Sequence, residues 1–168
     1  MDSTRGVDKR LISSGSDAED DPSTAIHTAF GSDGFSLGTN TEGNKDGDNY
    51  VAWLWKANGG TTTTNDASAT SVGSLDSVYQ ASTRAGFSIV TYTGAGGNQT
   101  IAHGLGAIPT VIIIRRRDDA GDWTSYHAAL GAEKFLRLNS NNAMGDQATY
   151  FNDTTPTSSV FTVGSNAK

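Results

Sequence analysis

The sequence predicts an all-β protein, an antiparallel β-sandwich of jelly-roll type with little or no helix. Turn-forming Gly, Asn, Asp and Thr recur at roughly the 8–12-residue spacing typical of sandwiches and barrels. The segments between them are short and rich in β-branched and aromatic residues, and helical periodicity is nearly absent. With 35% hydrophobic residues, 18% charged residues and 20 Gly, the chain is expected to have many turns and small cores.

Short runs between the turn residues are predicted to be strands. In the clearest of them, residues 86–94, Val90 and Tyr92 lie on the face opposite Phe87 and Ile89. The others, in chain order, are residues 10–13, 34–38, 50–56, 98–103, 110–116, 123–127, 134–139 and 158–164. Residues 71–83 have some apolar side chains at helical spacing, but their Ser and Thr content favours an extended chain.

The run 110–116 differs from the others because it is apolar on both faces. A strand with this pattern is expected to be central in its sheet. Residues 118–122 are turn-forming and separate this run from residues 123–127, so the two runs are predicted to form a hairpin.

Charge and composition exclude several classes of partner. The formal net charge is −6 and the pI is about 4.8, which argues against a nucleic-acid surface. The one basic cluster, Arg115, Arg116 and Arg117, alternates between strand faces and is interpreted as a solvated strand end. The chain has no Cys, which excludes disulfides and thiolate metal sites. No apolar run approaches the ~20 residues that span a bilayer, so no membrane contact is expected.

The two ends of the chain resemble each other. At an offset of about 125 positions, Gly6, Lys9, Leu11 and Ala18 match Gly131, Lys134, Leu136 and Ala143. After one inserted residue, Phe35, Leu37, Gly38 and Asn40 match Phe161, Val163, Gly164 and Asn166. The first copy continues into Tyr50–Lys56. The chain is therefore expected to begin inside one module and to end inside the next.

The repeat predicts a division of the chain into three parts. Residues 1–57 are the closing half of a first β-module and can either pack with the second module or complete it. Residues 58–84 are a Gly/Thr/Ser-rich linker, and residues 85–168 are a second β-sandwich module that is truncated. The edge left open in the second module would be filled by the N-terminal copy, by another subunit, or by residues of a longer protein.

Several of these strings occur together in one kind of protein. They are Gly86–Gly94, His103–Gly106 with Pro109, Trp123, Tyr126–His127 and Asn152–Phe161, with Arg5–Ser13 and Tyr50–Lys56 as the closing half of a preceding unit. Over nearly the whole chain they resemble a repeat module of uncharacterised tail and tail-fibre structural proteins of marine phages. The resemblance implies a virion structural protein of the tail or fibre. It implies no catalytic residue.

Residue types that could carry chemistry do not form a recognisable set. His103 precedes a Gly-rich turn without an acidic or nucleophilic partner, and we interpret it as structural. His27 and His127 are too scattered for zinc. Two acidic stretches offer oxygen ligands for Ca²⁺ but lack a complete loop, and they are interpreted as solvated: Asp17, Glu19, Asp20 and Asp21, and Asp46 with Asp48. Residues 94–97 are interpreted as a hairpin loop and not as a phosphate site.

Two functions stay open. The first is a structural and adhesive module of the virion that contacts other virion subunits, forms a homo-oligomer with a trimer favoured, and attaches to a host-surface receptor. The alternative is a lectin-like module that binds a host-surface glycan. Its candidate contacts are the aromatic side chains of Trp53, Trp55, Trp123, Tyr126 and Tyr150, although burial is the favoured interpretation for each. Neither function involves catalysis, a cofactor or a metal, and no ligand-binding residue can be assigned.

Overall fold

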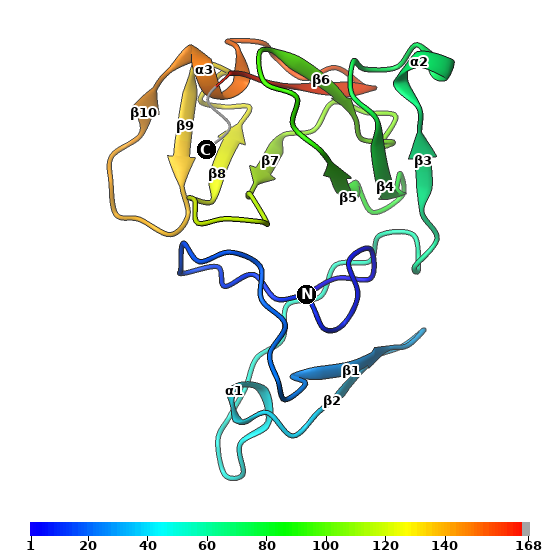
Figure 1. Ribbon diagram of the computed structural model, residues 1–168, viewed down its shortest axis with the longest axis vertical. Helices are drawn as coiled ribbons and strands as arrows, with labels where there is room; N and C mark the ends of the chain where they lie inside the picture. Colours follow the sequence, from blue (N-terminus) through cyan, green and yellow to red (C-terminus); the bar gives the residue numbers. More distant parts are fainter. Residues whose placement is uncertain (166–168) are drawn as a thin grey trace.

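The computed structural model describes residues 1–165 and has the all-β class that the sequence predicts (Figure 1). Short strands dominate, and the described helices have four residues each. The strands are β1 (His27–Phe30), β2 (Phe35–Leu37), β3 (Thr63–Asn65), β4 (Ser77–Ser82), β5 (Phe87–Tyr92), β6 (Gln99–Ala102), β7 (Val111–Ile114), β8 (Thr124–His127), β9 (Lys134–Arg137), β10 (Gly145–Asp146) and β11 (Val160–Val163). The helices are α1 (Thr41–Asn44), α2 (Ala67–Thr70) and α3 (Ala148–Phe151).

The strands form several small antiparallel sheets, and most of them lie in one sandwich-like body. That body contains the sheets β3-β4-β5, β6-β11 and β10-β9-β8-β7. Strands β6 and β11 lie across one end of it, between the other two sheets (Figure 1). The hairpin of β1 and β2 and helix α1 form a separate lobe below, and residues 1–21 lie between the lobe and the body. No helix in the described residues is long and apolar enough to cross a membrane.

The body has one interior with two groups of buried side chains. One group surrounds Tyr126 and Phe151, and the other surrounds Ile101 and Phe161. Side chains of β7 pack against both groups, namely Ile112 and Ile114. The two groups are therefore parts of a single core, to which each of the three sheets contributes.

Strand β5 shows how well alternation predicts the faces of a strand. It covers most of the predicted run 86–94, and Val90 and Tyr92 pack against the buried group around Ile101. Gly86 closes the preceding hairpin turn with a φ of +66°, a conformation that glycine adopts without strain. The prediction of strand and face is confirmed here.

Three other predictions are wrong. Residues 58–84 are not a linker, because they contain β3, α2 and β4, and β4 is the central strand of its sheet. Asp66 caps α2 and Ser71 ends it in the left-handed conformation, which the low-complexity composition concealed.

Residues 10–13 form no strand apart from a single bridge between Arg10 and Asp20. Residues 94–97 are not a hairpin loop, because β5 and β6 belong to different sheets.

Strand β7 is not central, contrary to the prediction for residues 110–116. It pairs with β8, as the predicted hairpin requires, but it lies at the edge of its sheet. Ile112 and Ile114 point into the core, whereas Val111 is 48% and Ile113 50% exposed. An apolar strand edge is thus left uncovered in this chain.

The internal repeat is present in the geometry as well as in the sequence. Lys9 forms an ion pair with Asp21, and the equivalent Lys134 forms one with Asp146. The bridge between Arg10 and Asp20 is antiparallel, and at the same offset Phe135 pairs with Gly145 in the ladder of β9 and β10. Residues far apart in the chain therefore fold in the same local way.

Two pairs of equivalent glycines strengthen this conclusion. Gly6 and Gly131 both have positive φ, of +105° and +84°. A Cβ on Gly38 would lie 2.0 Å from the carbonyl oxygen of Ala25, and a Cβ on Gly164 would lie 2.2 Å from that of Thr149. β2 and β11 occupy equivalent places before the second pair of glycines, whereas the matched residue Asn166 lies outside the described residues.

Candidate functional site

Residues 1–21, the N-terminal arm, are attached to the turn that follows β7. The amide of Glu19 donates to the carbonyl of Arg117 at 2.7 Å, and the amide of Gly121 donates to the carbonyl of Ser16 at 2.9 Å. The equivalent part of the second module, residues 126–146, lies within that module. The arm therefore belongs to the first copy of the repeat and docks on the second.

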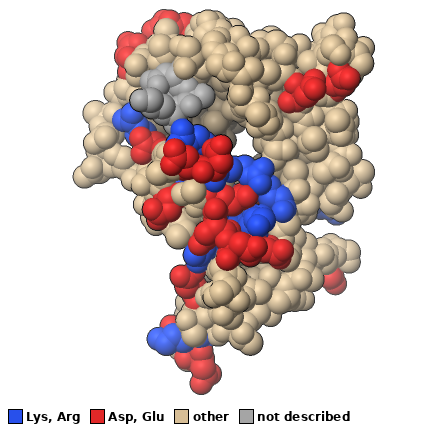
Figure 2. Space-filling model, in the orientation of Figure 1, with Lys and Arg blue, Asp and Glu red and all other residues tan. Residues whose placement is uncertain are grey.

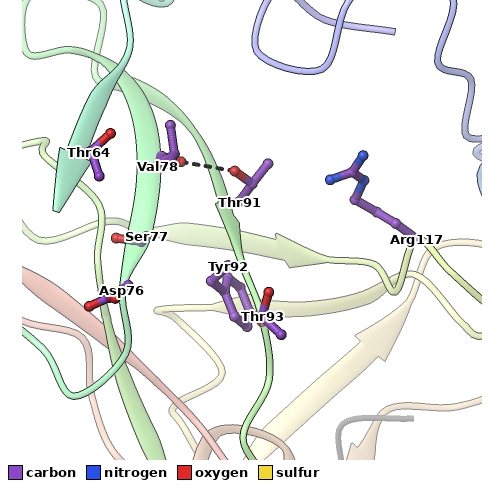
Figure 3. Close-up of a pocket in the computed structure, with 8 residues that line it drawn as sticks. All are labelled: Thr64, Asp76, Ser77, Val78, Thr91, Tyr92, Thr93 and Arg117. Atoms are coloured by element: carbon purple, nitrogen blue, oxygen red, sulfur yellow. Dashed lines mark hydrogen bonds between the residues drawn. The ribbon is translucent and has the colours of Figure 1, made fainter. Parts of the chain in front are cut away.

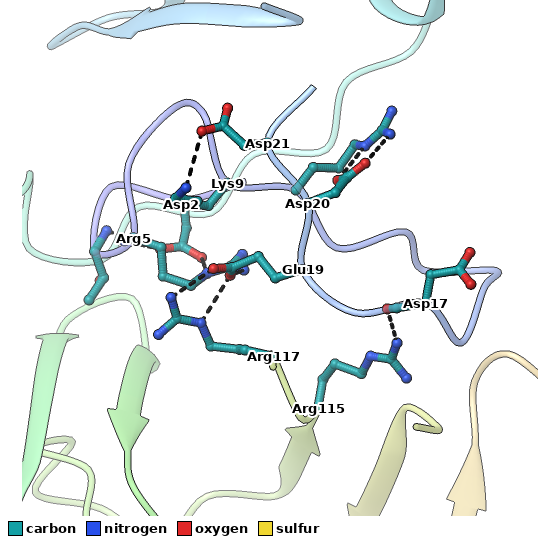
Figure 4. A network of polar contacts seen from close by, with 11 residues as sticks. Asp2, Arg5, Lys9, Asp17, Glu19, Asp20, Asp21, Arg115 and Arg117 are labelled. Atoms are coloured by element: carbon teal, nitrogen blue, oxygen red, sulfur yellow. Dashed lines mark hydrogen bonds and ion pairs between the residues drawn. The ribbon is translucent and has the colours of Figure 1, made fainter. Parts of the chain in front are cut away.

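Ionic contacts reinforce this attachment (Figure 4). The Glu19 carboxylate accepts from Arg117 Nε at 3.0 Å, from Arg117 Nη2 at 2.7 Å and from Arg5 Nη1 at 2.5 Å. Asp2 binds the other side of Arg5, at 2.6 Å. Hydrogen bonds from Arg117, followed by those from Arg5, hold the pKa of Glu19 below its usual range, although burial opposes this shift. In Figure 2 the charged side chains gather at this junction between the body and the lobe.

The arginine cluster is an anchor, and its interpretation as a solvated strand end is wrong. Arg115 donates to the carbonyl of Asp17, and its guanidinium lies 5.8 Å from the ring centroid of Trp123. The indole of Trp123 donates to the carbonyl of Ile12 at 2.8 Å. Arg115 and Arg117 thus hold two points of the same arm, and the aromatic ring adds a cation–π contact.

A buried glutamine fixes the beginning of the arm. Gln80, in the middle of β4, is fully buried. Its amide donates to Thr4 Oγ1 at 2.9 Å, and its Oε1 accepts from Ser3 Oγ at 3.2 Å and from the amide of Gly60 at 2.9 Å. A polar side chain without exposure must be satisfied internally, so the arm is part of the folded body at this point.

An open hollow of about 300 Å³ lies beside the anchored arm (Figure 3). Strands β3, β4 and β5 form most of its wall, and Arg117 completes the wall from the segment that follows β7. Most of its polar groups are hydroxyls, with one carboxylate and one guanidinium; the lining residues are Thr64, Asp76, Ser77, Val78, Thr91, Tyr92, Thr93 and Arg117. Burial raises the pKa of Tyr92 to about 12, so its phenol is protonated at neutral pH. The hollow offers hydrogen bonds to a polar ligand but no nucleophile activated by a base.

The histidines do not meet in the structure. His103 is buried, accepts at Nδ1 from the amide of Leu105 at 3.1 Å, and lies 3.2 Å through Nε2 from the carbonyl of Thr157. Both ring nitrogens thus have backbone partners, and burial lowers its pKa. His27 lies in the lobe, and His127 is exposed at the end of β8. The geometry of His103 is that of a residue that ties two loops together.

The acidic stretch is largely neutralised by cations of the chain. Besides Glu19, Asp20 pairs with Arg10 at 2.5 Å and Asp21 pairs with Lys9 at 3.2 Å. The expectation of a solvated loop is therefore wrong for Glu19, whose side chain is 10% exposed. Among the described residues, no group of three His, Cys, Asp or Glu side chains could hold a metal ion.

The aromatic candidates divide into buried and exposed residues. Tyr126 is in the core, and the ring centroid of Tyr150 lies 4.2 Å from the ring centroid of Phe135. In contrast, Trp53 is 75% and Trp55 is 66% exposed. The prediction that residues 50–56 form a strand is wrong for this chain, because the segment pairs with nothing in the described residues. Its apolar side chains are left in solvent, and only Trp55 has an aromatic contact, with Phe87 at 6.1 Å.

With this geometry established, comparison with known proteins places the chain in a family. The model of a domain of unknown function, DUF7483, matches residues 1–168. The chain belongs to this family. No curated protein and no solved structure matches it. Because the DUF7483 match covers both copies of the repeat, the arm and the body belong to the same family unit, in agreement with the contacts between them.

Packing of residues 1–57 on the second module was one of the arrangements expected from the sequence, but the contacts of the arm were not predicted, although a signal for them exists. The chain has one basic cluster, at residues 115–117, and its densest acidic cluster lies at residues 17–21. Opposite charges in a chain with few charged residues favour contact. The position of Glu19 between Arg5 and Arg117 could not be predicted in this way, because it depends on how the arm folds back.

We expect acid, or Glu19→Gln, to release the arm from the body. Because the pKa of Glu19 is lowered in the folded protein, its contribution is present above the ordinary glutamate pKa of about 4.3 and is lost as the pH falls through the lower folded-state value. Glu19→Gln should cost about 1.5–3 kcal/mol at neutral pH. Trp123 fluorescence and the rate of proteolysis within residues 6–18 measure the release.

Asp21→Asn is the matched control, because its ion pair with Lys9 is exposed to solvent. It should cost less than about 1 kcal/mol and leave the arm protected. Equal release by both variants would contradict a specific role for Glu19.

Proposed function

We propose that this protein is a structural module of a phage tail or tail fibre, and that it attaches the virion to a host surface. The observation that carries the proposal is the repeat, in which the closing part of one module is docked on the body of the next by Gln80, Arg115 and Arg117. Modules that clamp their neighbours build stiff, elongated assemblies, since each one contacts only the adjacent repeats. The resemblance to tail and tail-fibre modules supports the same function.

The surface is also suited to assembly. Residues 50–56 and the outer side of β7 expose large apolar side chains, including Val51, Trp53, Leu54 and Ile113. A run of exposed large apolar side chains, such as that of residues 50–56, indicates a protein contact in the assembled state. The proposed partners are other virion subunits and further copies of this chain, with a trimer favoured, and the proposed location is the virion.

The test is to locate the protein on the particle. Antibodies raised against the purified protein should label the tail or fibres of the phage that carries its gene, as seen by immunoelectron microscopy. Particles disrupted with detergent should release the protein in a fixed ratio to the other tail subunits. Labelling confined to the soluble fraction of infected cells, with unlabelled particles, would exclude a virion role.

A second candidate function is glycan binding, and the hydroxyl-lined hollow favours it. Sugar hydroxyls are bound by convergent hydrogen-bonding side chains, and Thr93 and Asp76 line this space. Thr91 and Arg117 line it too, but Thr91 Oγ1 donates to the carbonyl of Val78 and Arg117 is bound by Glu19. Cleavage is not part of this proposal, since it would require two carboxylates held across the sugar bond. Asp76 is the one carboxylate in the wall.

A glycan array followed by titration tests this second function. Binding should be weakened at least about tenfold by Asp76→Ala, which removes a carboxylate acceptor from the hollow. Asp48→Ala, on the exposed loop after α1, should bind like the wild type. An array without hits, or equal weakening by both variants, would reject the hollow as a glycan site.

A further inference from the structure

Two edge strands of the body pack against the same part of the core. Each of them has one edge without a hydrogen-bonded neighbour. β5 is the last strand of the sheet β3-β4-β5, and β7 is the last strand of the sheet β10-β9-β8-β7. Val90 and Tyr92 of β5 and Ile112 and Ile114 of β7 pack against one buried group. Nevertheless, no backbone hydrogen bond joins β5 to β7 in the part of the chain that the structure describes. Two free edges therefore border a common interior.

The hollow borders all three strands of the sheet β3-β4-β5, and half of its lining comes from Thr64, Asp76, Ser77 and Val78. Thr91, Tyr92 and Thr93 line it from β5 and the residue that follows, and Arg117 lines it from the segment after β7. Neighbouring strands of a sheet lie ~4.8 Å apart, so a strand placed between two others separates them by about twice that distance. Open space that borders both β5 and the segment after β7 is consistent with an additional strand between β5 and β7.

The segment Tyr50–Lys56 has the sequence pattern of a strand but belongs to no sheet. All of its residues are exposed, and both of its faces carry apolar side chains. A short apolar run of this kind is typical of a strand buried on both sides. β7 is also apolar on both faces, and it too lacks the second neighbour that this pattern predicts. One pairing would satisfy both segments.

The internal repeat indicates where such a segment belongs. In the first copy, Tyr50–Lys56 follows β2, and β2 is equivalent to β11. β11 closes over the buried group to which β5 and β7 contribute. A segment that follows a β11-like strand is thus expected to complete the body that contains this strand.

The segment is restrained from filling the gap in its own chain. The hydroxyl of Tyr50 binds the amide of Lys45 and the carbonyl of Thr41. At the other end Ala57 is buried and Gly60 is bound to Gln80, so the chain enters the body beside β3 and β4. Trp55 stacks on Phe87 at the start of β5, with the ring centroids 6.1 Å apart, and stays 66% exposed, so this contact holds the end of the segment outside the core. Insertion into a second copy keeps the contacts of Ala57 and Gly60 with the body and gives up the stacking of Trp55 on Phe87.

We infer that Tyr50–Lys56 of one copy inserts as a strand between β5 and β7 of a second copy. The inserted backbone pairs with both free edges, and its apolar side chains cover the core on one side and Val111 and Ile113 on the other. Exchange of an element between identical chains produces a closed oligomer when it is reciprocal or cyclic. This inference deepens the proposed structural function and rests on it only in treating the chain as a unit of a repeated assembly.

Disulfide crosslinking between two different single-Cys variants tests the insertion. The chain has no Cys of its own, so no other disulfide can form. Val51→Cys and Ala52→Cys, one on each face of the segment, are each mixed with Ile113→Cys under mild oxidation. At least one mixture should give a disulfide-linked heterodimer in high yield. Asn141→Cys, exposed between β9 and β10, is the matched control and should give background yield. Equal yields with Ile113→Cys and Asn141→Cys would overturn the inference.

A chain that carries both Ala52→Cys and Ile113→Cys separates the two sources of the strand. Exchange predicts crosslinked oligomers at all concentrations at which the wild type associates. A crosslink formed only within single chains would show that the segment fills its own gap, which overturns insertion into a second copy. None of these results depends on whether antibodies label the virion, so the two proposals can fail independently.

Light scattering gives a second measurement that needs no crosslink. The wild type should have a mass of two or more chains, and Trp53→Asp should weaken this association at least about tenfold. Trp53 is 75% exposed, so the variant is expected to fold, and circular dichroism verifies this. Ile108→Asp, at another exposed apolar residue, should associate like the wild type. A monomeric wild type, or an associated Trp53→Asp, would overturn the inference.

Discussion

Gly164→Ala is expected to destabilise the body by about 3 kcal/mol or more, because the added methyl group has no space. Its Cβ would lie 2.2 Å from the carbonyl oxygen and 2.5 Å from the carbonyl carbon of Thr149, which are backbone atoms that a rotamer change cannot move. The amide of Gly164 also donates to the carbonyl of Tyr150 at 2.7 Å, which holds the two segments together. Urea denaturation followed by tryptophan fluorescence measures the loss.

Gly94→Ala is the matched control, since nothing lies within 4 Å of its Cβ and its φ is not positive. It should change the free energy of unfolding by less than about 1 kcal/mol. Gly38→Ala gives a further comparison, because Gly38 is the equivalent glycine of the first copy. It should disorder the β1–β2 lobe and leave the body folded. A stable Gly164→Ala protein would contradict the prediction, because it would show that the backbone at Thr149 moves away from the added methyl group at little cost.

Ile101→Ala is expected to cost about 3–4 kcal/mol. Ile101 is fully buried on β6, forms a parallel bridge with Leu75, and is the centre of the group that includes Phe161. Removing its branched side chain leaves a cavity where three sheets meet, and the backbones of paired strands cannot collapse into it. Denaturation in urea, with the m-value compared between variants, measures the effect.

Ile108→Ala serves as the control because Ile108 is 59% exposed in the loop before β7. Its loss should be within about 0.5 kcal/mol of zero. Equal effects of the two substitutions would mean that the core of the body does not lie around β6.

The sequence predicted local structure correctly where the residue pattern within one segment was enough to define it. The strand at 86–94 and the inward face of Val90 and Tyr92 followed from alternation. The pairing of β7 with β8 followed from the turn at 118–122. His103 was interpreted as structural, and in the folded chain its ring nitrogens contact the carbonyl of Thr157 and the amide of Leu105.

Prediction failed where composition concealed a contact with a distant segment. Residues 58–84 look like a linker because they are rich in Thr, Ser and Gly, yet β4 is central and carries the buried Gln80. Gln80 is satisfied by Ser3 and Thr4, which no local pattern connects with it. The candidate hollow was missed for the same reason, since its wall combines three strands with Arg117.

The sequence by itself determined the all-β class, the short strands, the turns and the repeat, because these depend on side-chain alternation, on glycine conformations and on matches at a constant spacing. Only the tertiary structure decided which segments have neighbours. It showed that the arm docks on Arg115 and Arg117 and that, within residues 1–165, β7 pairs with β8 alone and residues 50–56 pair with no strand. The physical reason is that the pairing of a strand edge depends on which other edge reaches it, and this depends on the path of the whole chain.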